Sequence, residues 1–455
     1  MKSIGALETS GRPRGPPNEA AHDTSAPARK RTVAIRLIWI RVARIPGPDH
    51  GSMPASPLNE IIPPGPARFA LFDYGFRPFF LFCGGYALLI VPLWLFRFAH
   101  ASVPFGSLPG VYWHSHEMLF GFVMAAIAGF LLTAVPSWTG SRGFAGRPLM
   151  LVVALWAAGR VAMATVGSTP FWLTAVAELA LVPALLVMLA PPILRARNRN
   201  LPILAVLTTL WLIDSVFIQA LHRGDMPLAA GAMRMAVDLV LLLVTVIGGR
   251  IVPAFTSNAL RQAGSEAKPV TRNWLEAVAI GSVVAIALCD LFAPDSPLAG
   301  ALAAIAAAAH AMRLAGWKSF RLGREPILWI LHVAYAWVPL ALALKAAWLL
   351  GDLGFAAKWQ HALTAGAFAT MILAVMTRAS LGHTGRPLVV ARPITIAYLL
   401  LTGGALLRVF GGALFPAGYL WTLTLSGLAW TAAFLIFVWV YGPLLMSPRV
   451  DGRQG

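Results

Sequence analysis

Long apolar runs dominate this sequence and restrict what it can fold into. Between Phe76 and Tyr441 the chain consists of apolar runs of about 20 residues separated by short loops, and a helix of about 20 apolar residues crosses a bilayer. The chain is 58% hydrophobic and 12% charged, whereas soluble proteins contain about 25% charged residues. The runs lack the alternating polarity of barrel strands. We therefore expect an all-α membrane protein whose main partner is the lipid bilayer.

Dividing these runs at their loops predicts a bundle of about twelve transmembrane helices. The expected ranges are Phe76–Arg97, Glu117–Pro136, Pro148–Val166, Phe171–Ala190, Leu201–His222, Ala229–Val252, Trp274–Leu291, Leu298–Leu314, Pro326–Leu350, His361–Thr377, Pro393–Gly411 and Ala417–Tyr441. They define a transmembrane domain over residues 68–446, followed by a short cytoplasmic tail, residues 447–455.

The loop charges predict the orientation of this domain. Lys and Arg concentrate in alternate loops, for example Arg195, Arg197 and Arg199, while the loops between them contain few basic residues. Because basic loops stay in the cytoplasm, both termini are expected there. The same distribution explains the net charge of +18 without nucleic acid as a partner. The only cysteines, Cys83 and Cys289, lie in apolar runs, which excludes a disulfide framework.

Residues 1–67 differ from the rest of the chain. They are rich in Pro, Gly, Ala and Arg and have no sustained helical period, which predicts a disordered basic leader. The short run Val33–Ile45 is interrupted by arginines and is too short to span a bilayer. A basic amphipathic surface segment is one interpretation. An alternative is that translation starts at Met53.

Short similarities suggest three four-helix pseudo-repeats. The second, sixth and tenth expected helices end in related sequences, AVPSWTG (Ala134–Gly140), IVPAFTSN (Ile251–Asn258) and AVMTRAS (Ala374–Ser380). Internal repeats occur in membrane proteins of several functions, so this pattern does not by itself define the activity.

Histidines in and beside the spans are the main candidates for binding a cofactor. The predicted topology divides them into an outer group, His114, His116, His222 and His361, and an inner group, His310, His332 and His383. Neutral imidazole is a ligand for haem iron and for copper, and ligands in a helix bundle project inward from facing helices. We expect the cofactor contacts among these seven residues, with His114, His116 and His361 as the metal ligands.

Other ionisable residues within spans are candidates for ion pairs or proton transfer, because such residues are costly in a bilayer. Arg160 and Glu178 are expected at similar depth, and Arg234 lies one turn from Asp238. The remaining candidates are Glu117, beside the first histidine pair, and Asp214, near the middle of its helix.

Several longer motifs resemble the NnrS family. They are FRPFFL (Phe76–Leu81), WHSHEMLFGF (Trp113–Phe122), GFLLTAVPSWTG (Gly129–Gly140), GGRIVPAFTSN (Gly248–Asn258) and HALTAGAFATMILAVMTRASLGHTGRPL (His361–Leu388). The resemblance covers the chain from about Phe69 to the C-terminus and excludes the leader. It implies a bacterial inner-membrane protein with haem and copper, linked to nitric oxide metabolism and nitrosative stress, with nitric oxide as ligand or substrate. It does not imply a defined reaction or assign ligands.

Two other functions are compatible with the sequence. One is a multi-span transporter of a small molecule or metal complex, suggested by the repeat and by acidic residues within spans. The other is a non-catalytic membrane sensor or assembly factor. A conventional haem–copper oxidase is disfavoured, because the adjacent His-His pair typical of such enzymes is missing from the sequence.

Overall fold

The computed structural model describes residues 69–100, 108–321 and 325–452. These residues form helices joined by short loops and contain no strand, apart from an isolated bridge between Val166 and Thr169. The predicted leader, residues 1–67, and the alternative start at Met53 lie outside the described residues.

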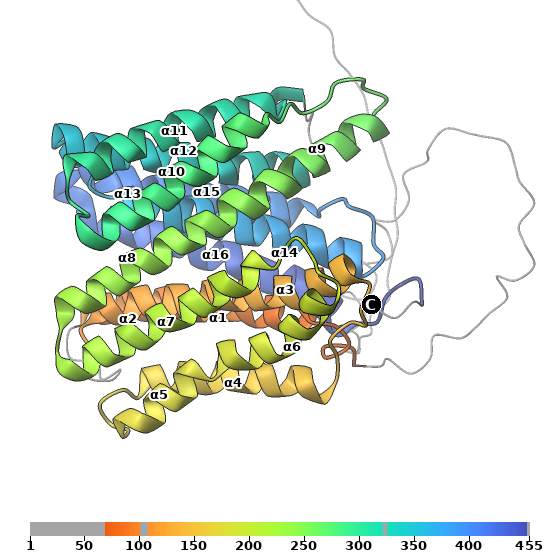
Figure 1. The fold of residues 1–455 in the computed structure, drawn as a ribbon, viewed down its shortest axis with the longest axis horizontal. Helices are drawn as coiled ribbons and strands as arrows, with labels where there is room; N and C mark the ends of the chain where they lie inside the picture. Colours follow the sequence, from red (N-terminus) through yellow and green to blue (C-terminus); the bar gives the residue numbers. More distant parts are fainter. Residues whose placement is uncertain (1–68, 101–107, 322–324, 453–455) are drawn as a thin grey trace, which may run out of the picture. The chain divides into compact units, whose positions relative to one another are not determined.

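Twelve helical segments in the described residues are long and apolar enough to cross a membrane, which confirms the expected number (Figure 1). They are α1 (Phe76–Ala99); α2, η2 and α3 (Gly110–His116, Glu117–Val123, Met124–Thr139); α4 (Arg147–Ala164); α5 and α6 (Phe171–Leu179, Leu181–Arg195); α7 (Pro202–Arg223); α8, η3 and α9 (Met226–Leu243, Val244–Gly248, Gly249–Gln262); α10 (Asn273–Phe292); α11 (Pro297–Gly316); α12 (Pro326–Gly351); η5, α13, η6 and α14 (Gly354–Ala356, Trp359–His361, Ala362–Phe368, Ala369–His383); α15 (Arg392–Leu414); and η7 with α16 (Pro416–Gly418, Tyr419–Met446).

Several spans extend beyond the ranges expected from hydropathy, and span two begins at Gly110 and not at Glu117. The sixth runs over Met226–Gln262, although only Ala229–Val252 was predicted, and the tenth continues to His383. Hydropathy marks the part of a helix that matches the bilayer, whereas backbone hydrogen bonding continues into polar sequence. His383 therefore lies in the last turn of α14, not beyond the inner end of the helix as predicted.

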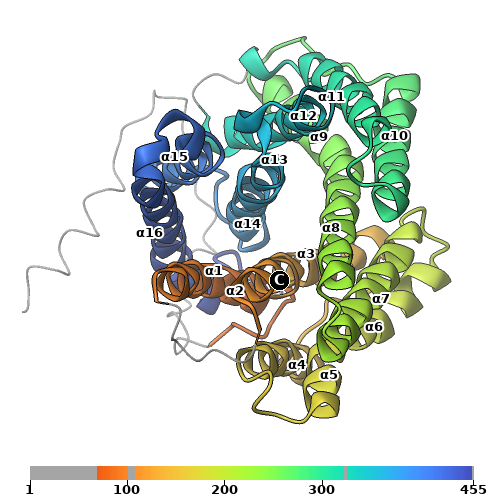
Figure 2. The same cartoon turned by 90° about the vertical axis from the view of Figure 1, so that its left-hand side faces the viewer.

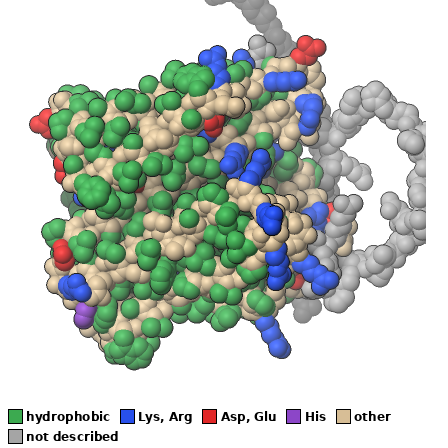
Figure 3. Space-filling model, viewed as in Figure 1, with side chains coloured by type: hydrophobic (Ala, Val, Ile, Leu, Met, Phe, Trp, Pro, Cys, Tyr) green, Lys and Arg blue, Asp and Glu red, His purple; other side chains and the backbone are tan. Residues whose placement is uncertain are grey.

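Spans two, six, nine and ten form the interior of the bundle. Their central stretches are 78%, 56%, 67% and 67% buried, whereas the other spans reach 44% at most. Viewed along the helices, α3 and α14 lie inside a ring that includes α4, α10 and α15 (Figure 2). On the face shown in Figure 3, hydrophobic side chains cover the middle, and Lys and Arg gather mainly towards one end. This distribution suits a protein embedded in lipid.

The last span packs against the first. α16 lies along both α1 and α15 (Figure 2). The indole Nε1 of Trp430 donates to the carbonyl of Ala87 at 2.9 Å, and buried Arg77 donates to the carbonyls of Leu445 and Ser447 at 3.0 and 2.6 Å. Side chains and backbone from the two ends of the domain thus close the bundle.

Spans two, six and ten each contain a π-helical segment, namely η2, η3 and η6. Segments η2 and η6 both have seven residues and begin directly after a histidine, His116 and His361. Glycine follows five residues after each histidine, at Gly121 and Gly366. Further along, each of the two spans has a Thr-Gly pair at the same distance from its histidine. The agreement is consistent with the predicted pseudo-repeat, which stays a prediction. π-Helical turns are rare and often occur at functional sites.

Gly366 in η6 provides a test of this packing. A Cβ atom there would overlap the buried indole of Trp337, while a Cβ at Gly248 in η3 would meet Tyr335 at an ordinary 3.5 Å. We expect Gly366→Ala to destabilise the protein by about 1–3 kcal/mol, the usual cost of overpacking. Gly248→Ala is the matched control and should unfold at or above the wild-type temperature. Thermal unfolding in detergent measures both, and equal melting temperatures for the two variants would contradict the described packing.

Candidate functional site

His116 is the centre of a buried polar cluster in span two. It is the last residue of α2, its side chain is fully buried, and its ring stacks between Phe120 and Phe217 at 5.1 and 4.9 Å. Nδ1 lies 2.9 Å from Oε1 of Glu117, and Nε2 lies 3.0 Å from Oδ1 of Asp214. Because carboxylates accept and do not donate, protonation of both ring nitrogens would satisfy both contacts.

Arg160 from α4 connects this histidine to a second carboxylate. Its Nη1 donates to Oε1 of Glu117 at 2.8 Å, and its Nη2 pairs with Oε1 of Glu178 from α5, the partner expected from the sequence. The hydroxyl of Tyr86 in α1 donates to the other oxygen of Glu117. Side chains from five spans, the first to the fifth, therefore meet in one hydrogen-bonded network.

Close helix packing holds this network in place. The indole Nε1 of Trp156 in α4 donates to the carbonyl of Gly121 at 3.0 Å. A Cβ at Gly121 would overlap the ring of Tyr86 and lie 3.1 Å from Nη1 of Arg160. Glycine at this position of η2 thus allows α1 and α4 to approach close enough for their side chains to reach Glu117.

The charges within the cluster do not balance. Glu117, Glu178 and Asp214 face at most two cationic groups, Arg160 and a protonated His116, so ionisation of all three acids leaves one negative charge. Uncompensated buried charge is strongly unfavourable, and a proton or a bound cation would balance it. Ligand atoms of His116, Glu178 and Asp214 lie within 4.8 Å of one another. One imidazole with two carboxylates suits hard divalent cations better than copper.

A second group of polar side chains surrounds His361. Nη2 of Arg408 in α15 donates to its Nε2 at 3.0 Å, and Arg408 also acts electrostatically on His114 and contacts Tyr419. His114 stacks on Trp94 at 4.7 Å, and its buried Nδ1 has no hydrogen-bond partner among the described residues. In the described part of the chain, no carboxylate pairs with Arg408. His361 and His116 each directly precede a π-helical segment, but His361 contacts a cation, whereas His116 contacts acids.

The remaining predicted histidines lie apart from these two groups. His222 is exposed and stacks on Phe171 at 3.9 Å. His332 uses both nitrogens, with Thr256 at 2.8 Å and Ser319 at 2.7 Å.

His310 and His383 differ in what surrounds them. Nδ1 of His310 contacts the hydroxyl of Tyr335 at 2.7 Å, and the ring also lies next to the backbone of Ala279. The ring of His383 lies 5.5 Å from that of Phe76 and 6.2 Å from that of Tyr74. The inner histidines therefore do not converge on a single centre.

Asp238 and Arg234, one turn apart, interact electrostatically, but no ion pair within 4 Å joins them in the described residues. Nη1 of Arg234 lies 3.9 Å from the exposed Asp295, and Asp238 faces Asp290 and Lys345. Sequence reasoning missed Asp290 as a site residue, although an acidic residue inside the apolar run before Pro294 was a usable signal. It also missed Tyr86, which resembles any other aromatic residue of a membrane span.

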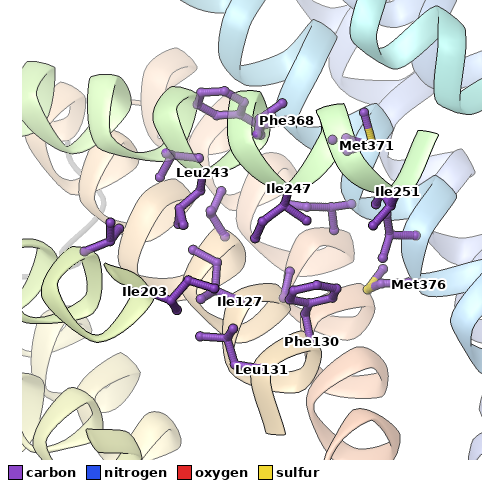
Figure 4. A pocket seen from close by; sticks show the side chains of 18 of the residues that line it. Ile127, Phe130, Leu131, Ile203, Leu243, Ile247, Ile251, Phe368, Met371 and Met376 are labelled. Atoms are coloured by element: carbon purple, nitrogen blue, oxygen red, sulfur yellow. The ribbon is translucent and has the colours of Figure 1, made fainter. Parts of the chain in front are cut away.

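An apolar cavity of about 100 Å³ lies between spans one, two, five, six and ten (Figure 4). All three π-helical segments contribute side chains to it, for example Val123, Ile247 and Phe368, and none of the described histidines lines it. Pockets for drug-sized ligands have volumes of about 300–1,000 Å³. The cavity is thus neither large enough for a porphyrin nor lined with its usual ligands.

The fold and these clusters define a polytopic α-helical membrane protein with ionisable groups buried between its helices. The profile of the family described as NnrS protein matches residues 70–449, and the chain belongs to this family. The match covers all twelve spans and confirms the resemblance seen in the motifs. No curated protein matches the chain.

Arg160 tests the charge balance of the cluster around His116. Arg160→Met removes the cation that contacts both Glu117 and Glu178, so buried carboxylates lose their partner. We expect a loss of about 3–5 kcal/mol in stability, as found when one partner of a buried ion pair is removed. Chemical denaturation in detergent measures it.

Two variants complete this experiment. Arg223→Met alters an exposed arginine and should change stability by no more than about 0.5 kcal/mol. Combining Arg160→Met with Glu178→Gln should recover part of the lost stability, since fewer acids remain uncompensated. A single Arg160→Met variant as stable as Arg223→Met would show that the ion pairs do not form.

Proposed function

We propose that this chain is a haem- and copper-binding protein of the bacterial inner membrane that acts in nitric oxide metabolism or in protection against nitrosative stress. Its membership of the NnrS family supports the proposal. The structural observation that carries it is the buried, unpartnered Nδ1 of His114 next to Arg408 and His361. A buried imidazole nitrogen without a hydrogen bond is costly unless it has another ligand, such as a metal.

His114 is the histidine best suited to hold haem iron. It has one buried ring nitrogen without a hydrogen-bond partner among the described residues. Arg408 beside His114 provides a cation for a haem propionate, a kind of charge-assisted contact that arginine favours. Haem held by His114 would supply an iron that can bind nitric oxide.

His361 is the residue best suited to copper in the outer group. Imidazole suits copper, whereas the carboxylates around His116 do not. His116, predicted as a metal ligand, has both nitrogens in contact with carboxylates. We assign it the different role of holding protons, on Nδ1 towards Glu117 and on Nε2 towards Asp214. The connected groups Tyr86, Glu117, His116 and Asp214 form a chain along which a proton can be passed.

Transport is the second candidate function. The acids buried within spans, Glu178, Asp214 and Asp238, are the observation that favours it, because such residues mark ion or proton pathways in transporters. Transport predicts substrate flux in proteoliposomes that is independent of any chromophore.

Optical and metal analysis of the purified protein tests the haem and copper assignment. We expect a Soret band that shifts on addition of nitric oxide, together with bound copper. His114→Ala should lose Soret absorbance, and His361→Ala should lose copper. His222→Ala, an exposed histidine, and His332→Ala, whose nitrogens are both hydrogen-bonded, should retain both signals. A folded, colourless and metal-free wild type would reject the proposal.

We also propose that both termini face the cytoplasm. The alternation of basic loops and the even number of spans support this orientation. A green fluorescent protein fused after residue 455 should therefore fluoresce, and alkaline phosphatase fused there should be inactive. Alkaline phosphatase fused after Gly224, in a loop expected on the opposite side of the membrane, should be active. Active phosphatase at the C-terminus would contradict the proposed orientation and place both termini outside the cytoplasm.

A further inference from the structure

A third buried cluster lies between α8, α10 and α12. Asp290 in α10 and Lys345 in α12 form an ion pair between Oδ2 and Nζ, and their side chains are 0% and 1% exposed. The ammonium of Lys345 also lies 4.7 Å from the centre of the Trp359 ring. Lysine in such a dry environment remains charged only if an anion compensates it, and Asp290 supplies that charge.

Asp238 in α8 adds a second acid to this pair. It is 1% exposed, and its carboxyl group lies next to that of Asp290. Ionised carboxylates contain acceptors only, so two of them cannot hydrogen-bond to each other and instead repel. A proton on one of the two groups would remove this repulsion and supply a donor between them.

The unpartnered atoms support the same conclusion. Oδ2 of Asp238 and Oδ1 of Asp290 are both buried, and neither receives a hydrogen bond from an N–H or O–H group of the described residues. Buried carboxyl oxygens without a donor are unfavourable. One proton held between the two carboxyl groups would supply a donor to this otherwise unsatisfied pair.

The cations around Asp238 and Asp290 do not compensate two negative charges, so one of the two carboxyl groups can hold a proton. Asp290 approaches from α10, Lys345 from α12 and Arg234 from α8 itself, and Arg234 is also 3.9 Å from the exposed Asp295. On the neighbouring helix α11, Arg313 is paired with Glu276, and His310 contacts Tyr335. On α7, Asp214 contacts His116. Lys345 is thus the only fully buried cation of the described residues acting on Asp238 and Asp290.

We propose that Asp238 and Asp290 form a proton-binding site, in which two carboxyl groups hold one exchangeable proton and Lys345 compensates the remaining negative charge. Protonation adds a proton from water to a carboxylate, and release returns it, with no change in any other bond. None of Asp238, Asp290 and Lys345 is one of the proposed haem or copper ligands, and the site does not need haem or copper to hold its proton. It gives the protein a membrane-embedded group that can be loaded and unloaded with protons.

Infrared spectroscopy of the purified wild-type protein in nanodiscs tests the site directly. A protonated carboxylic acid has a carbonyl stretch that shifts in deuterated water. We expect Asp238→Asn and Asp290→Asn each to lose one acid band, because either change removes the shared proton. Asp295→Asn, at an exposed acid, is the control and should leave the spectrum unchanged. A wild type without a buried acid band, or Asn variants that retain it, would overturn the proposal.

Lys345 provides a second measurement that remains informative if one Asn variant does not fold. Lys345→Met should lower the melting temperature, because it leaves the carboxyl pair without its cation. Adding Asp290→Asn to Lys345→Met should restore most of the loss, since the remaining Asp238 can then stay neutral. If the pair instead held a metal cation, the wild type would lack the acid band and its melting temperature would rise with added sodium or calcium. That result would also overturn the proposal.

Discussion

The need to compensate charge inside a low-dielectric bundle governs the arrangement of this protein. Arg160 contacts two acids, and those acids contact His116 or lie beside it. None of these groups is stable alone in hydrocarbon, and each is held by a partner from a different span. Because the partners belong to five spans, the network determines which helices must be adjacent. The lipid-facing side chains impose no such requirement, since one apolar surface packs about as well as another.

The three polar clusters follow a common plan with different chemistry. Spans two, six and ten contribute His116, Asp238 and His361, and the spans that follow them contribute Arg160, Asp290 and Arg408. The first cluster has excess acid, the second combines two acids with a lysine, and the third has a guanidinium with imidazoles and no acid among the described residues. An ancestral arrangement repeated within one chain would explain how the same framework holds groups with different affinities for protons, cations and anions.

The sequence predicted the spans well and the partners of buried groups only in part. Hydropathy identifies a helix that crosses a bilayer because the bilayer itself sets the required length and polarity. Depth along the axis paired Arg160 with Glu178 correctly. It could not show that Asp238 lies beside Asp290 of α10, or that Arg234 reaches towards Asp295, since the rotation of a span depends on its neighbours. The separation of His114 from the acids of His116 likewise depends on helix packing, not on spacing along the chain.

The contact between α16 and α1 has a consequence for biogenesis. A ribosome delivers α1 to the membrane long before it has made α16, whose Trp430 donates to Ala87 of α1 and whose Leu445 carbonyl accepts from Arg77. The surface of α1 that α16 covers and the guanidinium of Arg77 therefore lack these contacts until α16 has been made. The bundle can therefore close only at the end of synthesis, when the last helix, α16, packs against the first, α1.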